Sequence, residues 1–176
     1  MAWFGRRRGE PEPAPEADTG SGAGAGPAGA GESLVADGAS LQPVVARVPP
    51  QDRARIDAAV AALAAGGVDL DDLESIGAAL DAAYRSWEGA PLGSRADHAA
   101  IVERFAMAIG EHLDRHTDLD WQLVTDVFGT DLALTEGFKG SFVVVPHNLV
   151  AGRWMRGETG WVPAVVGHLV RRRTRR

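Results

Sequence analysis

The spacing of hydrophobic residues changes along the chain, and these changes divide it into predicted segments. Residues 49–115 carry apolar side chains at intervals of three and four, which is typical of amphipathic helices. From residue 121 the interval becomes two, which is typical of strands, and after residue 146 the helical interval returns. The pattern therefore predicts helices, then a small sheet, then helices again.

Three helices are predicted over residues 52–65, 71–87 and 97–115. Each begins at a side chain that can accept a hydrogen bond from the free backbone N–H groups of a first helical turn. The capping candidates are Asp52, Asp71 together with Glu74, and either Ser94 or Asp97. Gly77 lies beside the apolar stripe of the second helix, where a small residue lets another helix approach closely.

Three strands and two more helices are predicted after residue 120. Residues 121–126 and 131–134 form a hairpin around a turn that begins at Asp126 and ends at Gly129. Residues 142–145 are continuously apolar, so we expect this strand to be covered on both faces. It is either central in the sheet or the last strand of a meander. Helices follow over residues 147–155 and from about Thr159 to Arg171.

The predicted fold class is α+β, with three N-terminal helices, a small three-stranded antiparallel sheet and two C-terminal helices. Residues 49–171 form this single domain. Residues 1–48 are rich in Pro, Gly and Ala, so they bury too little apolar surface to offset chain entropy, and we expect a disordered tail. Residues 41–48 are more apolar and could pack on the domain as an extended lead-in. Residues 172–176 are a basic C-terminal tail.

Composition narrows the range of functions. The net charge of −6 argues against general nucleic-acid binding, because phosphate neutralisation needs a basic face. The chain has no Cys, which excludes disulfides and thiolate metal sites but leaves the compartment open. It has no apolar run long enough to span a membrane and no signal peptide, so we expect a cytoplasmic protein. The glycine-rich residues 20–31 lack the Lys-Ser/Thr of a phosphate-binding loop, and we expect no cofactor. Abundant Ala, Gly and Arg with a single Lys are typical of a GC-rich bacterial genome.

Three carboxylates near the hairpin are the candidates for catalysis: Glu111, Asp126 and Asp131. If two of them met in a pocket, one pKa would rise and an acid–base pair could result. The simpler interpretation treats each one separately. Asp126 then caps its own turn, Asp131 begins a strand, and Glu111 is solvated or bonds the backbone or a cation such as Arg153.

Three histidines are the candidates for metal binding. His112 and His116 are four residues apart, so both can lie on one helix face, and His147 could supply a third ligand. The Glu of a metalloprotease helix is missing between them. His116 at a helix C-terminus also suits the helix dipole without any metal. The second interpretation is favoured.

The candidates for a binding surface are Trp121, Arg153, Trp154 and Arg156. Together with Trp161 the tryptophans could form an aromatic platform for a ligand or partner. The alternative is that they belong to the core, and for Trp121 this alternative is favoured.

The stretch 109–156 resembles an uncharacterised bacterial family known as domain of unknown function 3806. The residues that carry the resemblance are Gly110-Glu111, Trp121, Asp126, Gly129, Asp131-Leu132-Ala133, Pro146, Val150 and Arg153. The resemblance implies an α+β domain and a set of positions, but no activity.

The leading hypothesis is a non-catalytic binding or interaction domain whose partner is another protein or a small ligand. The alternative is a hydrolase-type or metal-assisted enzyme that uses Glu111, Asp126 and the histidines, which requires three of these side chains to meet in one cleft. A third hypothesis is recruitment to a membrane surface through the two basic termini.

Overall fold

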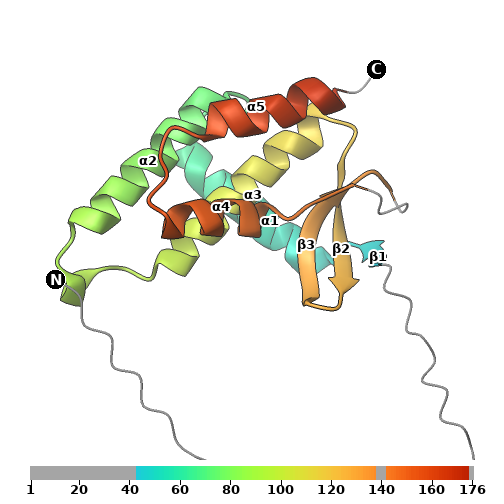
Figure 1. The fold of residues 1–176 in the computed structure, drawn as a ribbon, viewed down its shortest axis with the longest axis horizontal. Coiled ribbons are helices and arrows are strands. Elements are labelled where there is room, and N and C mark those ends of the chain that lie inside the picture. Colours follow the sequence, from blue (N-terminus) through green and yellow to red (C-terminus); the bar gives the residue numbers. More distant parts are fainter. Residues whose placement is uncertain (1–42, 138–141, 175–176) are drawn as a thin grey trace, which may run out of the picture. The chain divides into compact units, whose positions relative to one another are not determined.

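The computed structural model describes residues 43–137 and 142–174. Within these residues the α+β class is confirmed (Figure 1). The elements in chain order are β1 (Val44–Arg47), α1 (Pro50–Ala65), α2 (Leu73–Gly89), a one-turn 3-10 helix (Leu92–Ser94), α3 (His98–His116), β2 (Asp120–Asp126), β3 (Gly129–Thr135), β4 (Val143–Val144), α4 (Pro146–Met155) and α5 (Val162–Arg173). None of the described helices is long and apolar enough to cross a lipid bilayer.

The sheet is an antiparallel meander in the order β1-β2-β3-β4. The predicted hairpin is present, with Asp126 opposite Gly129. The prediction of three strands was wrong, because β1 pairs with β2 from Val44 opposite Thr125 to Arg47 opposite Gln122. Only five residues lie between Pro43 and Pro49, which is too short a pattern to indicate a strand. The pairing with β2 is what defines β1. The rest of the predicted tail, residues 1–42, lies outside the described residues.

The strand β4 differs most from its prediction. It has two residues, lies at the edge of the sheet and pairs only with β3 among the described strands, with Val144 opposite Leu134. Val143 is 37% exposed, so the expectation of cover on both faces was wrong. Pro146 starts α4 directly after this apolar run, which leaves too few residues for a longer strand.

The helix starts follow the predicted pattern except at α1, α2 and α5, and α5 begins at Val162 and not near Thr159. Asp97 caps α3 by accepting a hydrogen bond from the backbone N–H of Ala99. The cap of α2 is Asp72 rather than Asp71, and α1 begins two residues before Asp52, with no side-chain cap. A proline at the start of α1 has no N–H that would need a partner, which is why the helix can begin without one.

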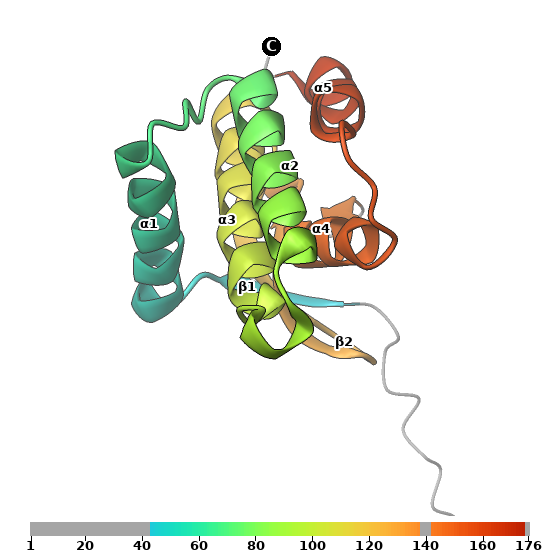
Figure 2. The same cartoon turned by 90° about the vertical axis from the view of Figure 1, so that its left-hand side faces the viewer.

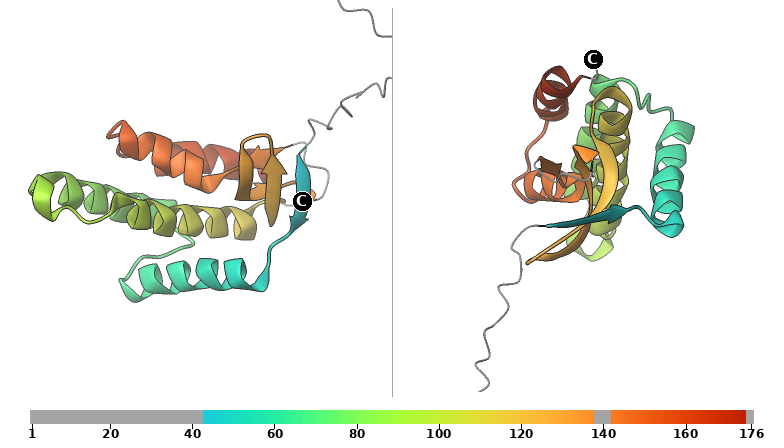
Figure 3. Two further views of the ribbon diagram at one scale, coloured as in Figure 1. Left: turned by 90° about the horizontal axis from the view of Figure 1, so that it is seen from below. Right: turned by 90° about the vertical axis from the view of Figure 1, so that its right-hand side faces the viewer.

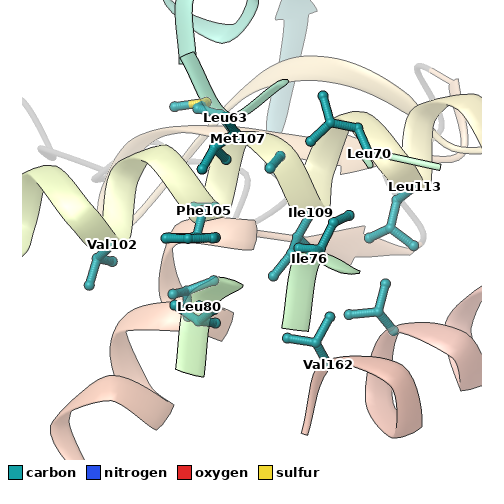
Figure 4. Close-up of a cluster of buried hydrophobic side chains, with 14 of the residues drawn as sticks. Leu63, Leu70, Ile76, Leu80, Val102, Phe105, Met107, Ile109, Leu113 and Val162 are labelled. Atoms are coloured by element: carbon teal, nitrogen blue, oxygen red, sulfur yellow. The ribbon is translucent and has the colours of Figure 1, made fainter. Parts of the chain in front are cut away.

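The helix α3 is the centre of the domain. Figure 2 shows it between α1 on one side and α4 with α5 on the other, and Figure 3 shows the strands gathered at one end of the helices. Its buried side chains include Val102, Phe105, Ile109 and Leu113, which contact apolar residues of the neighbouring elements (Figure 4). Gly77 lets α2 pack closely on α5, as predicted, because a Cβ there would lie 3.3 Å from Val162 Cβ.

Candidate functional site

Trp121 joins the sheet to the central helix. Its side chain is only 7% exposed and belongs to the hydrophobic core, which confirms the core interpretation. The indole ring lies against the backbone of α3 at Gly110, where a Cβ would come within 2.1 Å of Trp121 Cζ2 and 3.1 Å of Pro146 Cγ. Gly110 is therefore required because any side chain there would occupy the volume of the ring.

A cavity of about 450 Å³ lies next to this contact. Its walls come from the first turns of α1, the middle of α3, the β2–β3 hairpin and the start of α4. The apolar part of the lining consists of Pro49, Ala106, Met107, Trp121, Leu123, Leu132 and Pro146. Cavities of this size that combine an apolar wall with a few polar groups are typical of small-molecule sites.

The polar side of the cavity contains an ion-pair triad between α1 and α3. Arg55 Nη1 donates to Asp52 Oδ1 at 2.8 Å, and Arg55 Nη2 donates to Glu103 Oε1. Two carboxylates around one guanidinium leave a formal charge of −1, and their hydrogen bonds hold the pKa of Arg55 above its ordinary value. The triad thus presents both donors and acceptors to the cavity.

Two of the predicted site residues also border the cavity, in different ways. His147, the second residue of α4, lines it and is solvent-exposed. Asp131 lines it from β3, between Thr130 and Leu132. Because successive side chains of a strand point to opposite faces, the carboxylate of Asp131 points away from the face that carries those two neighbours.

Glu111 is buried beside two cations and does not line the cavity. Its side chain is 8% exposed, and its two carboxylate oxygens accept from Arg53 Nη2 at 2.8 Å and from Arg115 Nε at 3.1 Å. The cations are Arg53 and Arg115, not Arg153 as the sequence had suggested. This ion pair ties α1 to α3.

Asp126 lies at the tip of the hairpin. Its Oδ1 accepts a hydrogen bond from the backbone N–H of Phe128 at 2.7 Å, so it caps its own turn as the simpler interpretation predicted. Phe128 beside it is 93% exposed. Glu111, Asp126 and Asp131 therefore do not share a pocket, and no acid–base pair forms among them.

His112 and His116 are neighbours with separate partners. Their ring centroids are 4.4 Å apart. His112 Nδ1 lies 2.9 Å from the carbonyl oxygen of Leu70, and His116 Nε2 lies 3.1 Å from Asp71 Oδ1. His147 is on α4, next to the cavity, and does not join them. In the described part of the chain, no group of three or more His, Asp or Glu side chains has an arrangement that could hold a metal ion.

We expect the free energy of unfolding to fall as the pH is lowered through about 6.5, because of His112. Burial lowers the pKa of this histidine below its ordinary value of 6.5. As the pH falls, His112 therefore binds a proton at a higher pH in the unfolded chain than in the folded chain, so acid favours unfolding. For one proton, the free energy of unfolding changes by at most about 1.4 kcal/mol per pH unit. Urea unfolding at several pH values between 5 and 8 measures the slope of the free energy of unfolding against pH.

The matched variants for this measurement are His112→Asn and His168→Asn. Asparagine at position 112 keeps a donor for Leu70 but does not titrate, so the slope should decrease. His168 is exposed on α5, and its replacement should leave the slope unchanged. An unchanged slope in His112→Asn would contradict the assignment. The hydrogen bond from His116 lowers the pKa of Asp71 below 3.8, so this carboxylate contributes only in a separate, more acidic range.

The remaining candidates for a binding surface lie apart from Trp121. Trp154 is buried among aromatic rings, with Tyr84 at 5.0 Å and Trp87 at 5.4 Å between ring centroids. The guanidinium of Arg153 stacks over Trp161 at 4.6 Å. Arg156 is exposed and donates to Glu158 Oε1 at 2.6 Å. These tryptophans thus stabilise the packing of α4 on its neighbours and do not form one shared platform.

Sequence reasoning missed the residues that complete these groups. The sequence did not mark Arg53, which pairs with Glu111, as a site candidate. It also did not mark the three charged residues that line the cavity, Asp52, Arg55 and Glu103. The spacing of Asp52 and Arg55, three apart on one helix, was the only available signal, and such pairs are common on solvated helix faces. The contacts of Arg55 with Glu103 and of Arg53 with Glu111 join positions 48 and 58 residues apart, and no local sequence pattern indicates them.

The fold and the cavity define a small α+β domain with a ligand-sized cavity between its helices and its sheet. Residues 92–164 match the family model described as Domain of unknown function (DUF3806), which confirms the resemblance. The matched segment contains Gly110, Trp121 and Pro146, and thus the walls that α3, the hairpin and α4 give to the cavity. No curated protein and no solved structure matches the chain.

Proposed function

We propose that this domain binds a small ligand in the cavity between α1, α3, the β2–β3 hairpin and α4, without catalysing a reaction. The observation that carries the proposal is the combination of an apolar wall, which includes Trp121, with the Asp52–Arg55–Glu103 triad across one cavity. The volume of about 450 Å³ suits a metabolite-sized molecule. An apolar body would contact Trp121 and its neighbours, and polar groups would contact the triad and His147.

The enzyme hypothesis has less support from the same geometry. It requires at least three of the proposed acids, bases or metal ligands to meet in one cleft. Only His147 and Asp131 of these candidates line the cavity. Glu111 is bound by two arginines, Asp126 caps a turn, and His112 and His116 contact Leu70 and Asp71. Binding therefore explains the cavity with fewer assumptions than catalysis does.

A thermal-shift screen of the full chain against a library of small metabolites tests the proposal. A ligand present at a hundred times its dissociation constant adds about 2.7 kcal/mol to the free energy of unfolding. The variant Thr130→Trp places a large side chain on an exposed position of the cavity lining and should abolish the shift. Thr125→Trp is the matched control, since Thr125 faces Thr130 across the hairpin and shares its hydroxyl hydrogen bond but does not line the cavity.

Three outcomes would contradict the proposal. The first is a screen in which no compound shifts the melting temperature. The second is a shift that persists at full size in Thr130→Trp, which would place the ligand elsewhere. The third is chemical conversion of a stabilising compound during incubation, detected by mass spectrometry, which would support an enzyme.

A further inference from the structure

A second hollow lies on another part of the domain, between β4, α4 and α5. It is an open groove of about 860 Å³. Its apolar floor includes Val144, Leu149, Val165 and Leu169. None of its lining residues lines the cavity described above, so the groove is a separate feature.

The charged residues of the groove all have one sign. Arg153 and Arg171 line it, and no Asp or Glu among the described residues does. This contrasts with the chain as a whole, whose net charge is −6. Arg171 is exposed and forms no ion pair with any residue that the structure describes. Arg153 forms a long ion pair with Glu158, with 3.6 Å between Nε and Oε2, and its Nη1 donates to the carbonyl oxygen of Leu149 at 3.1 Å. Its buried Nε has no hydrogen-bond partner among the described residues.

One wall of the groove is the free edge of the sheet. β4 is the last strand in the order, and no described strand pairs with its outer side. Backbone N–H and C=O groups at such an edge can hydrogen-bond to an extended chain. Val143 at this edge is 37% exposed.

We propose that this groove binds an extended peptide segment of a partner protein in which apolar residues are flanked by Asp or Glu. The apolar side chains would cover the floor formed by Leu149, Val165 and Leu169, and the carboxylates would pair with Arg153 and Arg171. The free edge of β4 would bind the peptide backbone. The positive charges of Arg153 and Arg171 favour acidic segments over basic ones.

The free edge of β4 and the half-buried apolar floor favour a peptide over an anionic membrane, which would also be attracted by the arginines. Leu149, Val165 and Leu169 are half-buried and lie in a hollow. A bilayer binds apolar side chains that protrude into it. Half-buried side chains do not insert into a bilayer in this way, whereas a peptide that pairs with the edge of β4 can cover them.

Selection of random peptides displayed on phage against the full chain tests the proposal. We expect enrichment of sequences in which Leu, Ile or Val is flanked by Asp or Glu. Fluorescence anisotropy with an enriched peptide then gives the dissociation constant. Arg171→Glu should weaken binding by about tenfold or more, because it reverses a charge in the groove.

The matched control is Arg172→Glu, which makes the same charge change at the next residue of α5. Arg172 is exposed and does not line the groove, so the dissociation constant should change by less than about threefold. Thr130→Trp should leave peptide binding unchanged, which separates this site from the cavity. Both arginine positions are exposed, so circular dichroism should show that the variants fold.

The proposal is overturned if the selection enriches no peptides, or only peptides without acidic residues. It is also overturned if Arg171→Glu and Arg172→Glu weaken binding equally, since that would indicate non-specific electrostatic attraction. Vesicles containing phosphatidylserine provide the last test. If the chain sediments with them and Arg171→Glu abolishes sedimentation while peptide binding is unaffected, the groove serves a membrane surface instead.

Discussion

Replacing Trp121 with alanine will lower the free energy of unfolding by about 3–5 kcal/mol. The side chain is 7% exposed and joins β2 to α3 at Gly110. Its removal leaves a void that the surrounding backbone cannot fill, so the cost includes both lost transfer energy and the cavity. Urea denaturation followed by circular dichroism measures the change.

The control for this variant is Leu92→Ala, which shortens a side chain that is 83% exposed. We expect it to change the free energy of unfolding by less than about 0.5 kcal/mol. A loss below about 1 kcal/mol in Trp121→Ala would mean that the ring contributes little to packing. Trp121 would then serve ligand contact and not the packing of the core.

Gly110→Ala is expected to destabilise the protein by about 2–3 kcal/mol, although alanine is a better helix former than glycine. The added Cβ would lie 2.1 Å from Trp121 Cζ2 and 2.3 Å from Cη2, so the ring would have to move. Pro146 Cγ, at 3.1 Å from the same point, restricts that movement. The same denaturation experiment measures the loss.

Two further variants separate the contact with Trp121 from a general effect of helix glycines. Gly167→Ala in α5 places a Cβ 3.3 Å from the flexible end of Arg171, so we expect a change between zero and about 1 kcal/mol of stabilisation. In a Trp121→Ala background, Gly110→Ala should no longer destabilise, because the ring is gone. If Gly110→Ala costs the same in both backgrounds, the contact with the indole is not the cause.

The candidate site was predictable only in part. Trp121 was recognised as a core residue, because an alternating strand pattern placed it among apolar neighbours. Asp126 was recognised as a turn residue from its spacing to Gly129. The histidine pair followed from helical spacing, but the partners Leu70 and Asp71 did not, since they lie 42 and 45 residues away in the sequence.

Local patterns along the chain determined the α+β class, the approximate helix positions, the hairpin and the close approach at Gly77. These features depend on interactions between residues near each other in sequence, such as caps, turns and the 3.6-residue period, so the sequence alone contains their signal.

The tertiary structure decided which residues work together. It joined β1 to the sheet, placed β4 at an edge, paired Glu111 with Arg53, and assembled the cavity and the groove from several elements each. These contacts link positions far apart in the chain, and each residue alone has several chemically reasonable partners. Only the packing of the helices against one another and against the sheet selects among them, because burial and charge pairing must be satisfied for the whole domain at once.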